Sequence, residues 1–436
     1  MHDIDIFAAR RAGLARVMGS GVAVIPTAPE RVRNRDSYYP YRFDSYFYYL
    51  TGFREPEAVL VIVAGERARS ILFCRDKDPE HEVWDGYRFG PESACVEFRV
   101  DEAHSVTRLD ELMPMLLADQ GAVFCRLGSD SAWDARVLAW INAVRGQARR
   151  GVVAPPIVHD VCALLDDMRL IKDGHEIAIM RRAAAISAGA HRCAMRAARP
   201  GSAEFEIEAV LLHEFRRHGA QAPAYAPIVA GGANACVLHY VQNSSVLKDG
   251  DMLLIDAGCE LDGYASDITR TFPVNGRFSP AQKAVYGLVL SAQADAIAQV
   301  KPGNAWNAPH EAAVRTLVGG LIDLGLLRGS VDQAVETEAY KKFYMHRTGH
   351  WLGLDVHDAG DYKIQGRWRD LQPGMVLTVE PGCYIRAGEG VPAAFAGIGV
   401  RIEDDLLVTT AGCEILSAAA PKGIAEVEAA MEARRD

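Results

Sequence analysis

The sequence has 436 residues, 49% of them hydrophobic and 24% charged, which is typical of a globular protein and long enough for two domains. Its net charge of −10 argues against nucleic acid or an anionic membrane surface as the partner. No apolar run reaches the roughly 18 residues of a transmembrane helix, and the first residues lack the apolar stretch of a signal peptide. The nine cysteines are scattered without a CxxC pair, so we expect reduced thiols in a cytoplasmic protein.

The first third of the chain alternates short apolar runs with amphipathic segments. The apolar runs end in glycine, proline or charge, as buried strands do. They cover residues 21–26, 58–65, 70–74 and 121–128. Residues 110–120 and 131–146 carry the apolar pattern of amphipathic helices. The alternation predicts an α/β domain over residues 1–170.

An aromatic stretch lies within this domain. Residues 33–53 contain six tyrosines and three phenylalanines. One interpretation is a packed aromatic corner of the core. The other is a contact with another subunit or domain. The sequence favours neither.

The second predicted domain, residues 171–436, contains two pairs of helices that each precede a strand-rich stretch. The first pair begins at Asp173, with Glu176 three residues later, which predicts a capping box. Glycine ends each helical segment. The segments cover residues 173–201, 204–220, 278–303 and 307–329.

A repeat is visible within the second domain. Residues 250–259 read GDMLLIDAGC and residues 374–383 read GMVLTVEPGC. An offset of 124 residues places Asp256 on Glu380. An acidic residue therefore ends an apolar strand twice, in corresponding places. The repeat predicts an α+β domain of two related halves, each contributing a carboxylate.

The first half contains a predicted hairpin with two acidic residues. Asp262 and Gly263 form its turn signal. Asp256 and Asp267 are eleven residues apart, which places both side chains on one face of such a hairpin. Two buried carboxylates repel each other unless they are paired. The alternatives are a hairpin held by a salt bridge to Arg270, or a cation bound between the two carboxylates.

The second half offers Glu380 and Glu403 in strand-like surroundings, and His350 lies nearby in the sequence HRTGHWLGLDVHD. Four carboxylates and one imidazole can hold two divalent ions about 3.5–4 Å apart. These hard ligands favour Mn²⁺, with Co²⁺, Fe²⁺ or Zn²⁺ possible. Scattered acidic residues are more often solvated surface, so composition alone leaves this site a hypothesis.

Several motifs together resemble the pita-bread metallopeptidases, and among these they are most similar to aminopeptidase P. Residues 36–61 resemble that family's N-terminal domain. The motifs of the second domain lie at residues 238–240, 255–276, 350–358, 373–382 and 397–405. The resemblance implies an α/β N-terminal domain followed by an α+β pita-bread catalytic domain with an internal pseudo-twofold repeat. One departure is Arg347, where the family usually has glycine.

The resemblance also implies roles for individual residues. The metal ligands are Asp256, Asp267, His350, Glu380 and Glu403, and Glu380 is also the general base. His357 and His239 contact the substrate, and His346 lines the pocket for proline. Tyr384, Arg401 and Trp84 match substrate-binding or supporting positions. Trp84 could equally be a packed core residue. We expect no site role for His191, His213, His218 and His310, and we expect His213 and His218, which lie on a polar helix, to be solvated.

The implied activity is hydrolysis of the N-terminal Xaa-Pro bond by a metal-bridging hydroxide, in peptides with proline second. A prolidase, which cleaves Xaa-Pro dipeptides, shares all five ligands and is the alternative. Creatinase shares the fold but lacks the carboxylate set, and an inactive pita-bread binding module would have lost ligands that are intact here. The family's dimers and tetramers make a homo-oligomer the expected state, without nucleic-acid or membrane partners.

Overall fold

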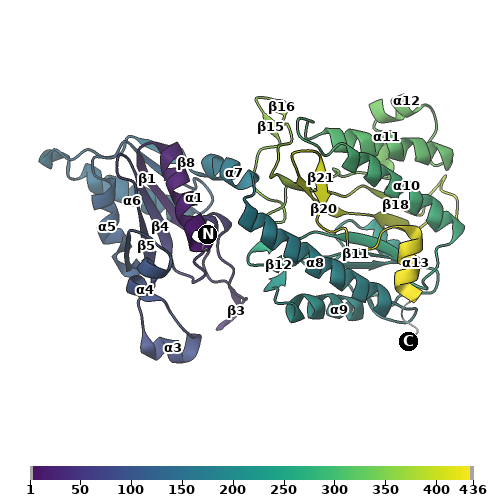
Figure 1. Cartoon of the computed structure of the whole chain (residues 1–436), viewed down its shortest axis with the longest axis horizontal. Coiled ribbons are helices and arrows are strands. Elements are labelled where there is room, and N and C mark those ends of the chain that lie inside the picture. The colour runs from purple at the N-terminus through teal and green to yellow at the C-terminus, as the bar shows by residue number, and fades with distance from the viewer. Residues whose placement is uncertain (1–2, 433–436) are drawn as a thin grey trace. The chain divides into compact units, whose positions relative to one another are not determined.

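A computed structural model describes residues 3–432, and the chain divides between Arg169 and Leu170 into two compact units (Figure 1). The division lies one residue before the boundary expected from the sequence. None of the described helices is long and apolar enough to cross a membrane. All nine cysteines are free thiols.

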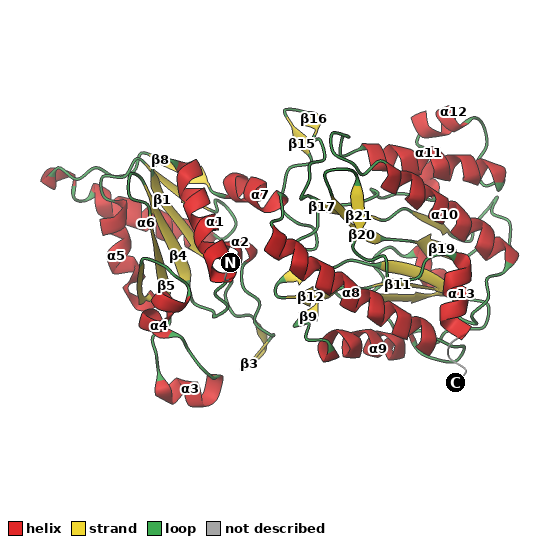
Figure 2. Ribbon diagram, viewed as in Figure 1, coloured by secondary structure: helices red, strands yellow, loops and turns green. Residues whose placement is uncertain are grey.

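The first unit is built on a six-stranded mixed sheet in the order β6-β5-β4-β1-β7-β8. Its strands are β1 (Gly21–Pro26), β4 (Val59–Ala64), β5 (Arg69–Cys74), β6 (Glu102–Ser105), β7 (Ala122–Cys125) and β8 (Ile157–Asp160). The four strands expected from the sequence are present as β1, β4, β5 and β7. The two expected helices are α5 (Leu109–Leu117) and α6 (Ser131–Arg145). Both pack their apolar sides against the sheet, where Met113 and Trp140 join its buried valines (Figure 2).

The aromatic stretch divides between core and surface. Phe47, Tyr48 and Phe53 are buried around the short helix α2 (Ser45–Thr51). Tyr38 and Tyr39 are more than half exposed, and Tyr38 lies on strand β3 (Ser37–Tyr38). The packed-corner interpretation therefore holds for the second part of the stretch, whereas the first part presents aromatic rings to solvent.

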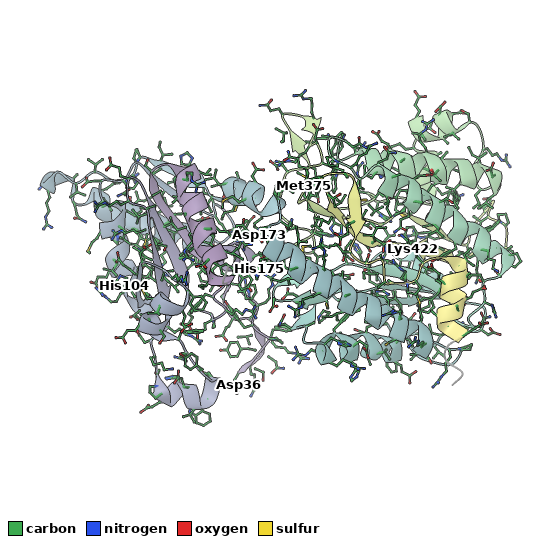
Figure 3. All side chains as sticks on the ribbon, viewed as in Figure 1. Asp36, His104, Asp173, His175, Met375 and Lys422 are labelled. Atoms are coloured by element: carbon green, nitrogen blue, oxygen red, sulfur yellow. The ribbon has the colours of Figure 1, made fainter. Side chains whose placement is uncertain are left out.

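The second unit repeats a helix pair followed by short strands, as the sequence predicts. The pairs are α8 (Gly174–Ala197) with α9 (Glu204–Arg217), and α10 (Pro280–Ala298) with α11 (Ala308–Asp323). Strands lie between the two pairs in Figure 2. The Asp173 side chain accepts from the backbone N–H of Glu176, whose side chain accepts from that of Asp173, so the capping box is confirmed. Figure 3 shows Asp173 at the beginning of α8.

The repeated sequences form corresponding ladders. In the first half β11 (Met252–Asp256) pairs with β14 (Thr269–Pro273), and in the second β17 (Val376–Val379) pairs with β20 (Asp404–Val408), both antiparallel. A second antiparallel pair in the second half joins β18 (Gly382–Ile385) to β19 (Ile398–Arg401). Asp256 and Glu380 therefore both stand where a buried strand ends.

The predicted hairpin has the expected turn but not one continuous ladder. Asp262 and Gly263 both have positive φ, 51° and 84°, as a type I′ turn requires. The strands beside the turn, β12 (Cys259–Leu261) and β13 (Tyr264–Ala265), join a separate sheet with β9 (Ala222–Pro223). Gly258 permits the crossing, because a Cβ there would collide with the carbonyl oxygen of Ser266. Asp267 consequently lies in the link that leads into β14.

The salt-bridged alternative for this hairpin is wrong. Arg270 is fully buried and donates from Nη2 to Oδ1 of Asp404 at 2.6 Å. It also donates to the backbone carbonyl of Glu403. Its charge is thus neutralised in the other half of the unit, and it is not the partner of Asp256 or Asp267.

Candidate metal centre

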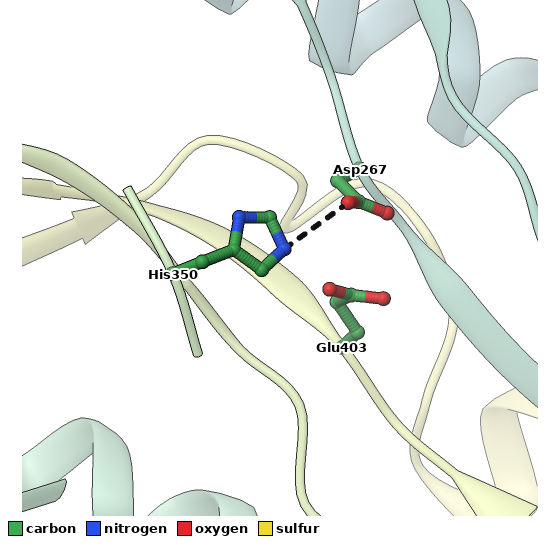
Figure 4. A group of neighbouring side chains, drawn as sticks. All are labelled: Asp267, His350 and Glu403. Carbon is green, nitrogen blue, oxygen red and sulfur yellow. Dashed lines mark ion pairs between the residues drawn. The ribbon is translucent and has the colours of Figure 1, made fainter. Parts of the chain in front are cut away.

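Three side chains from distant parts of the sequence meet in the second unit (Figure 4). Asp267 precedes β14, His350 precedes β17, and Glu403 lies between β19 and β20. Each offers one nitrogen or oxygen atom, and these atoms lie within 4.8 Å of one another. Nε2 of His350 is 3.5 Å from Oδ2 of Asp267. An imidazole with two carboxylates at this spacing is a donor set that suits a divalent cation.

Two further carboxylates adjoin this cluster. Oε1 of Glu380 lies 3.7 Å from Nε2 of His350. Asp256 is joined to Asp267 through the hydroxyl of Tyr225, which lies 2.6 Å from Oδ1 of Asp256 and also contacts Oδ1 of Asp267. The structure thus brings together all five residues predicted as ligands.

Burial makes this group of carboxylates costly when all are ionised. Burial and the charge of Asp256 raise the pKa of Asp267. Burial, Asp267 and Glu380 raise the pKa of Glu403 well above its usual range. Burial raises the pKa of Glu380 to about 7, against the lowering effect of His350. Two buried carboxylates, Asp267 and Glu403, and two half-buried ones, Asp256 and Glu380, need protons or cations to coexist, so the residues present fit a centre that carries more than one positive charge.

The tautomer of His350 also suits metal binding. Its Nδ1 lies 2.9 Å from the backbone carbonyl oxygen of Trp351. A carbonyl only accepts, so Nδ1 carries the proton. Nε2 faces Asp267 and Glu380, so it is the nitrogen that could bind a cation once it gives up its own proton. A backbone carbonyl that fixes the tautomer in this way is typical of metal-binding histidines.

Tyr225 was missed from the sequence. It lies in the loop before β10 (Ile228–Gly231), in the sequence APAYAPIV, which carries no motif or charge. Burial and the neighbouring Asp256 and Asp267 raise its pKa well above the usual value. It therefore remains a neutral hydroxyl, able to donate to one carboxylate of the pair. No local sequence signal could have identified it.

A chain of hydrogen bonds leads from Asp256 to the histidine-rich loop. Arg401, which is 4% exposed, donates to Oδ2 of Asp256 at 2.6 Å and to the Tyr384 hydroxyl at 2.9 Å. That hydroxyl lies 2.8 Å from Nε2 of His346. Nδ1 of His346 faces the carbonyl oxygen of Arg347 at 2.7 Å, so Nε2 accepts from Tyr384. Burial, followed by the charge of Arg401, lowers the pKa of His346 to about 3, and its ring is neutral.

A cavity of about 1060 Å³ opens onto these groups. All five candidate ligands lie at its wall, together with His239, His346 and His357. The ring of His357 lies 4.4 Å from that of His350. Trp306, Tyr362 and Trp368 add apolar surface that the sequence did not predict. The cavity therefore joins a polar, acidic floor to an aromatic wall, as expected for a site that binds part of a peptide.

Trp84 is the one predicted site residue that belongs to the first unit. It lies on α3 (Pro79–Asp85) and is 86% exposed. The alternative of a packed core tryptophan is therefore wrong. Its predicted part in substrate binding remains a prediction, because Trp84 is absent from the described residues that line the cavity.

The four histidines without an expected site role lie outside the candidate ligand set. His191 is buried, with Nε2 2.9 Å from the carbonyl oxygen of Ala257. His310 lies 2.8 Å from Oγ1 of Thr348. His213 and His218 are exposed, at the end of α9.

Comparison with known proteins now adds to this geometry. Residues 178–410 match metallopeptidase family M24, and residues 7–124 match the N-terminal domain of aminopeptidase P. The chain belongs to metallopeptidase family M24. It is a metal-dependent hydrolase that carries the aminopeptidase P N-terminal domain.

Individual relatives cover almost the whole chain. It is 47% identical to a Xaa-Pro aminopeptidase of Haemophilus influenzae, over 92% of this chain and 90% of the relative. It is 44% identical to the Xaa-Pro aminopeptidase of Escherichia coli, over 98% of each. Among solved structures, the aminopeptidase PepP of Pseudomonas aeruginosa matches with a TM-score of 0.98 and 50% identity, over 99% of this chain and 98% of the other.

These matches confirm the expected fold class. The M24 chain has an α/β N-terminal domain and a pita-bread catalytic domain with an internal pseudo-twofold repeat. A further solved relative is a zinc-substituted aminopeptidase P of Escherichia coli in complex with product, which matches with a TM-score of 0.97 and 43% identity over 100% of this chain and 99% of the other.

Proposed function

We propose that this metallopeptidase removes the first residue from peptides whose second residue is proline. The observation that carries the proposal is the group of four carboxylates and His350 that line one cavity, with Asp267, His350 and Glu403 at metal-binding spacing. Close relatives named Xaa-Pro aminopeptidases support the substrate class, and they do not favour the prolidase alternative. An inactive binding module is not supported either, because the whole predicted ligand set is intact.

We propose two divalent ions at this centre, Mn²⁺ in the first place and Co²⁺, Fe²⁺ or Zn²⁺ as alternatives. The proposed ligands are Asp256, Asp267, His350, Glu380 and Glu403. Bound there, such ions supply a water-derived nucleophile at neutral pH and polarise the scissile carbonyl group. The oxygen-rich donor set supports Mn²⁺ over metals that prefer thiolate.

The surrounding side chains would handle protons and position the substrate. Glu380 accepts the proton of the attacking water and passes it toward the proline nitrogen. That nitrogen carries no hydrogen in an Xaa-Pro amide and must be protonated to leave. His357 and His239 face the cavity, where an imidazole N–H can donate to the carbonyl oxygen as it gains charge.

The proline side of the pocket would be formed by His346 and its neighbours. Because Nε2 of His346 is occupied by the Tyr384 hydroxyl, the neutral ring offers the substrate mainly its apolar surface. Arg401 holds Asp256 and Tyr384 in place. We assign Trp84 to substrate binding only within a homo-oligomer, a dimer or tetramer, and we propose a cytoplasmic location.

The proposal is tested with protein stripped by a chelator and restored with Mn²⁺. An Xaa-Pro-Yaa tripeptide, an Xaa-Pro dipeptide and an Xaa-Ala-Yaa tripeptide are compared. We expect metal-dependent release of the first residue from the proline tripeptide, with little cleavage of the other two. In the same assay, Glu380→Gln should lower the activity on the proline tripeptide by at least about a hundredfold, because the substitution removes the proposed general base.

Two results would overturn parts of the proposal. Cleavage of the dipeptide alone would assign the chain to the prolidases and leave the metal centre in place. Absence of both activity and retained metal would remove the dinuclear hydrolase and favour a binding module.

A further inference from the structure

Arg347 lies at the wall of the cavity, beside the proposed proline pocket. It is exposed, and it follows His346 directly in the chain. Its φ is not in the left-handed region, so the backbone conformation here does not call for glycine. The arginine is therefore tolerated without backbone strain, and its side chain adds a guanidinium group to the cavity wall.

The guanidinium group is held in one orientation. It donates from Nη2 to Oδ1 of Asn307, whose Nδ2 donates to Oε1 of Glu311 at 2.5 Å. This second hydrogen bond turns the amide oxygen of Asn307 toward the arginine. The guanidinium carbon also lies 5.2 Å from the centroid of the Trp368 ring. A positioned arginine loses less entropy when it binds a ligand than a free one.

The charge of Arg347 is not neutralised by a carboxylate of the described residues. Of the two arginines at the cavity wall, Arg401 donates to Asp256, whereas the partners of Arg347 are an amide and an aromatic ring. The ammonium group of Lys363 lies 4.2 Å from the centroid of the same Trp368 ring. Two positive groups therefore lie at Trp368, a residue of the cavity wall, although the chain as a whole carries a net charge of −10.

The chemistry of the substrate decides which group such a charge attracts. In an aminopeptidase substrate the α-ammonium group is one residue from the scissile bond, so it stays close to the acidic floor. An arginine repels that ammonium group and attracts a carboxylate, which a peptide carries at its other end or on an acidic side chain. We propose that Arg347 binds a carboxylate on the leaving part of the peptide, and that it makes the enzyme prefer such substrates. This inference rests on the proposed function.

The test compares substrates that differ only in that charge. Xaa-Pro-Yaa with a free C-terminus is compared with its C-terminal amide, and Xaa-Pro-Asp-amide with Xaa-Pro-Asn-amide. We expect the charged member of at least one pair to have a KM about five- to tenfold lower, as for a partly exposed, oriented ion pair. Arg347→Gln should bring this ratio to about one. Arg347→Lys should keep part of it, because lysine retains the charge without the bidentate geometry.

The ratio is measured within each variant, so a general loss of activity does not imitate the effect. Arg328→Gln is the matched control, since Arg328 is exposed and lies outside the described cavity wall. The two substrate pairs distinguish a terminal carboxylate from an acidic side chain. Equal KM values for both pairs in the unmodified enzyme, or an unchanged ratio in Arg347→Gln, would overturn the inference and leave the proposed function intact. Failure to cleave any of these peptides would instead count against the proposed function.

Discussion

Lys172 and Asp358 form an ion pair of 2.8 Å in which each side chain is only 1% exposed. The two residues are 186 positions apart. Asp358 follows His357, and Lys172 immediately precedes the residue that caps α8. The pair therefore fixes the end of the histidine-rich loop to the beginning of the domain's longest helix.

Removal of one partner of this pair should destabilise the protein strongly. We expect Lys172→Met to lower the free energy of unfolding by about 3–5 kcal/mol, because the fully buried carboxylate of Asp358 would lose its ion pair with Lys172. Chemical denaturation measures this loss. The replacement should also lower kcat/KM, since His357 would lose its fixed position.

The exposed ion pair of Lys341 with Glu338 provides the control. It has a similar length, 2.6 Å, but its side chains are 51% and 57% exposed. Lys341→Met should therefore cost no more than about 1 kcal/mol. Equal losses for the two lysine variants would show that burial of the first pair has no energetic consequence.

A buried glutamate organises the loop that carries His239. Glu204 is fully buried at the beginning of α9. One of its oxygens accepts from the backbone N–H of Gly231 and from Asn234. The other accepts from the hydroxyl of Tyr240 and from the backbone N–H of Ser245. Four donors converge on one carboxylate, and Tyr240 is the neighbour of His239.

Glu204→Gln should therefore affect both stability and catalysis. The new amide group would face two donors, so we expect a loss of about 2–3 kcal/mol in the free energy of unfolding. We also expect a fall in kcat/KM, because the His239 loop loses its anchor. Glu206→Gln is the control, since Glu206 is exposed and accepts one backbone hydrogen bond that glutamine can also accept. Retention of full activity in Glu204→Gln would refute the positioning role.

The hydroxyl of Tyr384 is expected to matter more for activity than for folding. It joins Arg401 to His346, and phenylalanine would keep the ring while it breaks both contacts. We expect Tyr384→Phe to lower kcat/KM about tenfold, at a stability cost of about 1–2 kcal/mol. Steady-state kinetics, together with the metal content of the purified variant, measures the effect.

Tyr286→Phe is the control that separates the effect of losing a buried hydroxyl on stability from its effect on activity. Tyr286 is also buried and donates one hydrogen bond, to the carbonyl oxygen of Lys422 at 2.7 Å, outside the cavity wall. The Tyr286→Phe variant should lose as much stability as Tyr384→Phe and keep its activity. If both variants lose activity equally, the hydroxyl of Tyr384 has no special part in the site.

Metal removal should make stability depend on pH. Without metal, burial raises the pKa of Glu380 to about 7. Burial opposes the protonation of His350, but Asp267 and Glu380 together raise its pKa to about 9. Both groups bind protons more tightly when folded. Their stabilising contribution is therefore present below the unfolded pKa values and is lost as the pH rises through about 7 and about 9.

Bound metal replaces these protons, so the increase in Tm on metal binding should be larger at about pH 8.5 than at about pH 5.5. Thermal denaturation with and without a chelator measures it. Glu403→Gln, which removes one buried carboxylate, should reduce the loss of stability in the metal-free protein. An increase in Tm that becomes smaller with rising pH would contradict this account of the carboxylates.

The sequence predicted those features that depend on local pattern or on the repeat. Apolar runs identified four of the six strands of the first sheet, but not β6 and β8, and the Asp173 capping box marked the beginning of α8. The correspondence between Asp256 and Glu380 is visible as a sequence repeat, so it could be predicted without a structure. The family resemblance then supplied the remaining candidate ligands.

The features that were not predicted depend on contacts between distant segments. Tyr225 reaches two aspartates from a loop without any motif. Glu204 looks like an ordinary acidic residue in the first turn of a helix, and its burial follows from the loop that folds over it. Arg270 was considered as a partner within its own hairpin, but the chain crossing at Gly258 and the packing of the two halves direct it to Asp404.

The division of the proposed ligands between the two halves of the second unit also determines when, during synthesis, the metal site can form. Asp256 and Asp267 come from the first half, while His350, Glu380 and Glu403 come from the second. A ribosome must translate beyond Glu403 before the proposed ligand set exists. A nascent or truncated chain would present at most part of the set, with weaker affinity for the ions. Full metal binding would then require that synthesis has passed Glu403, and a shorter chain would lack peptidase activity.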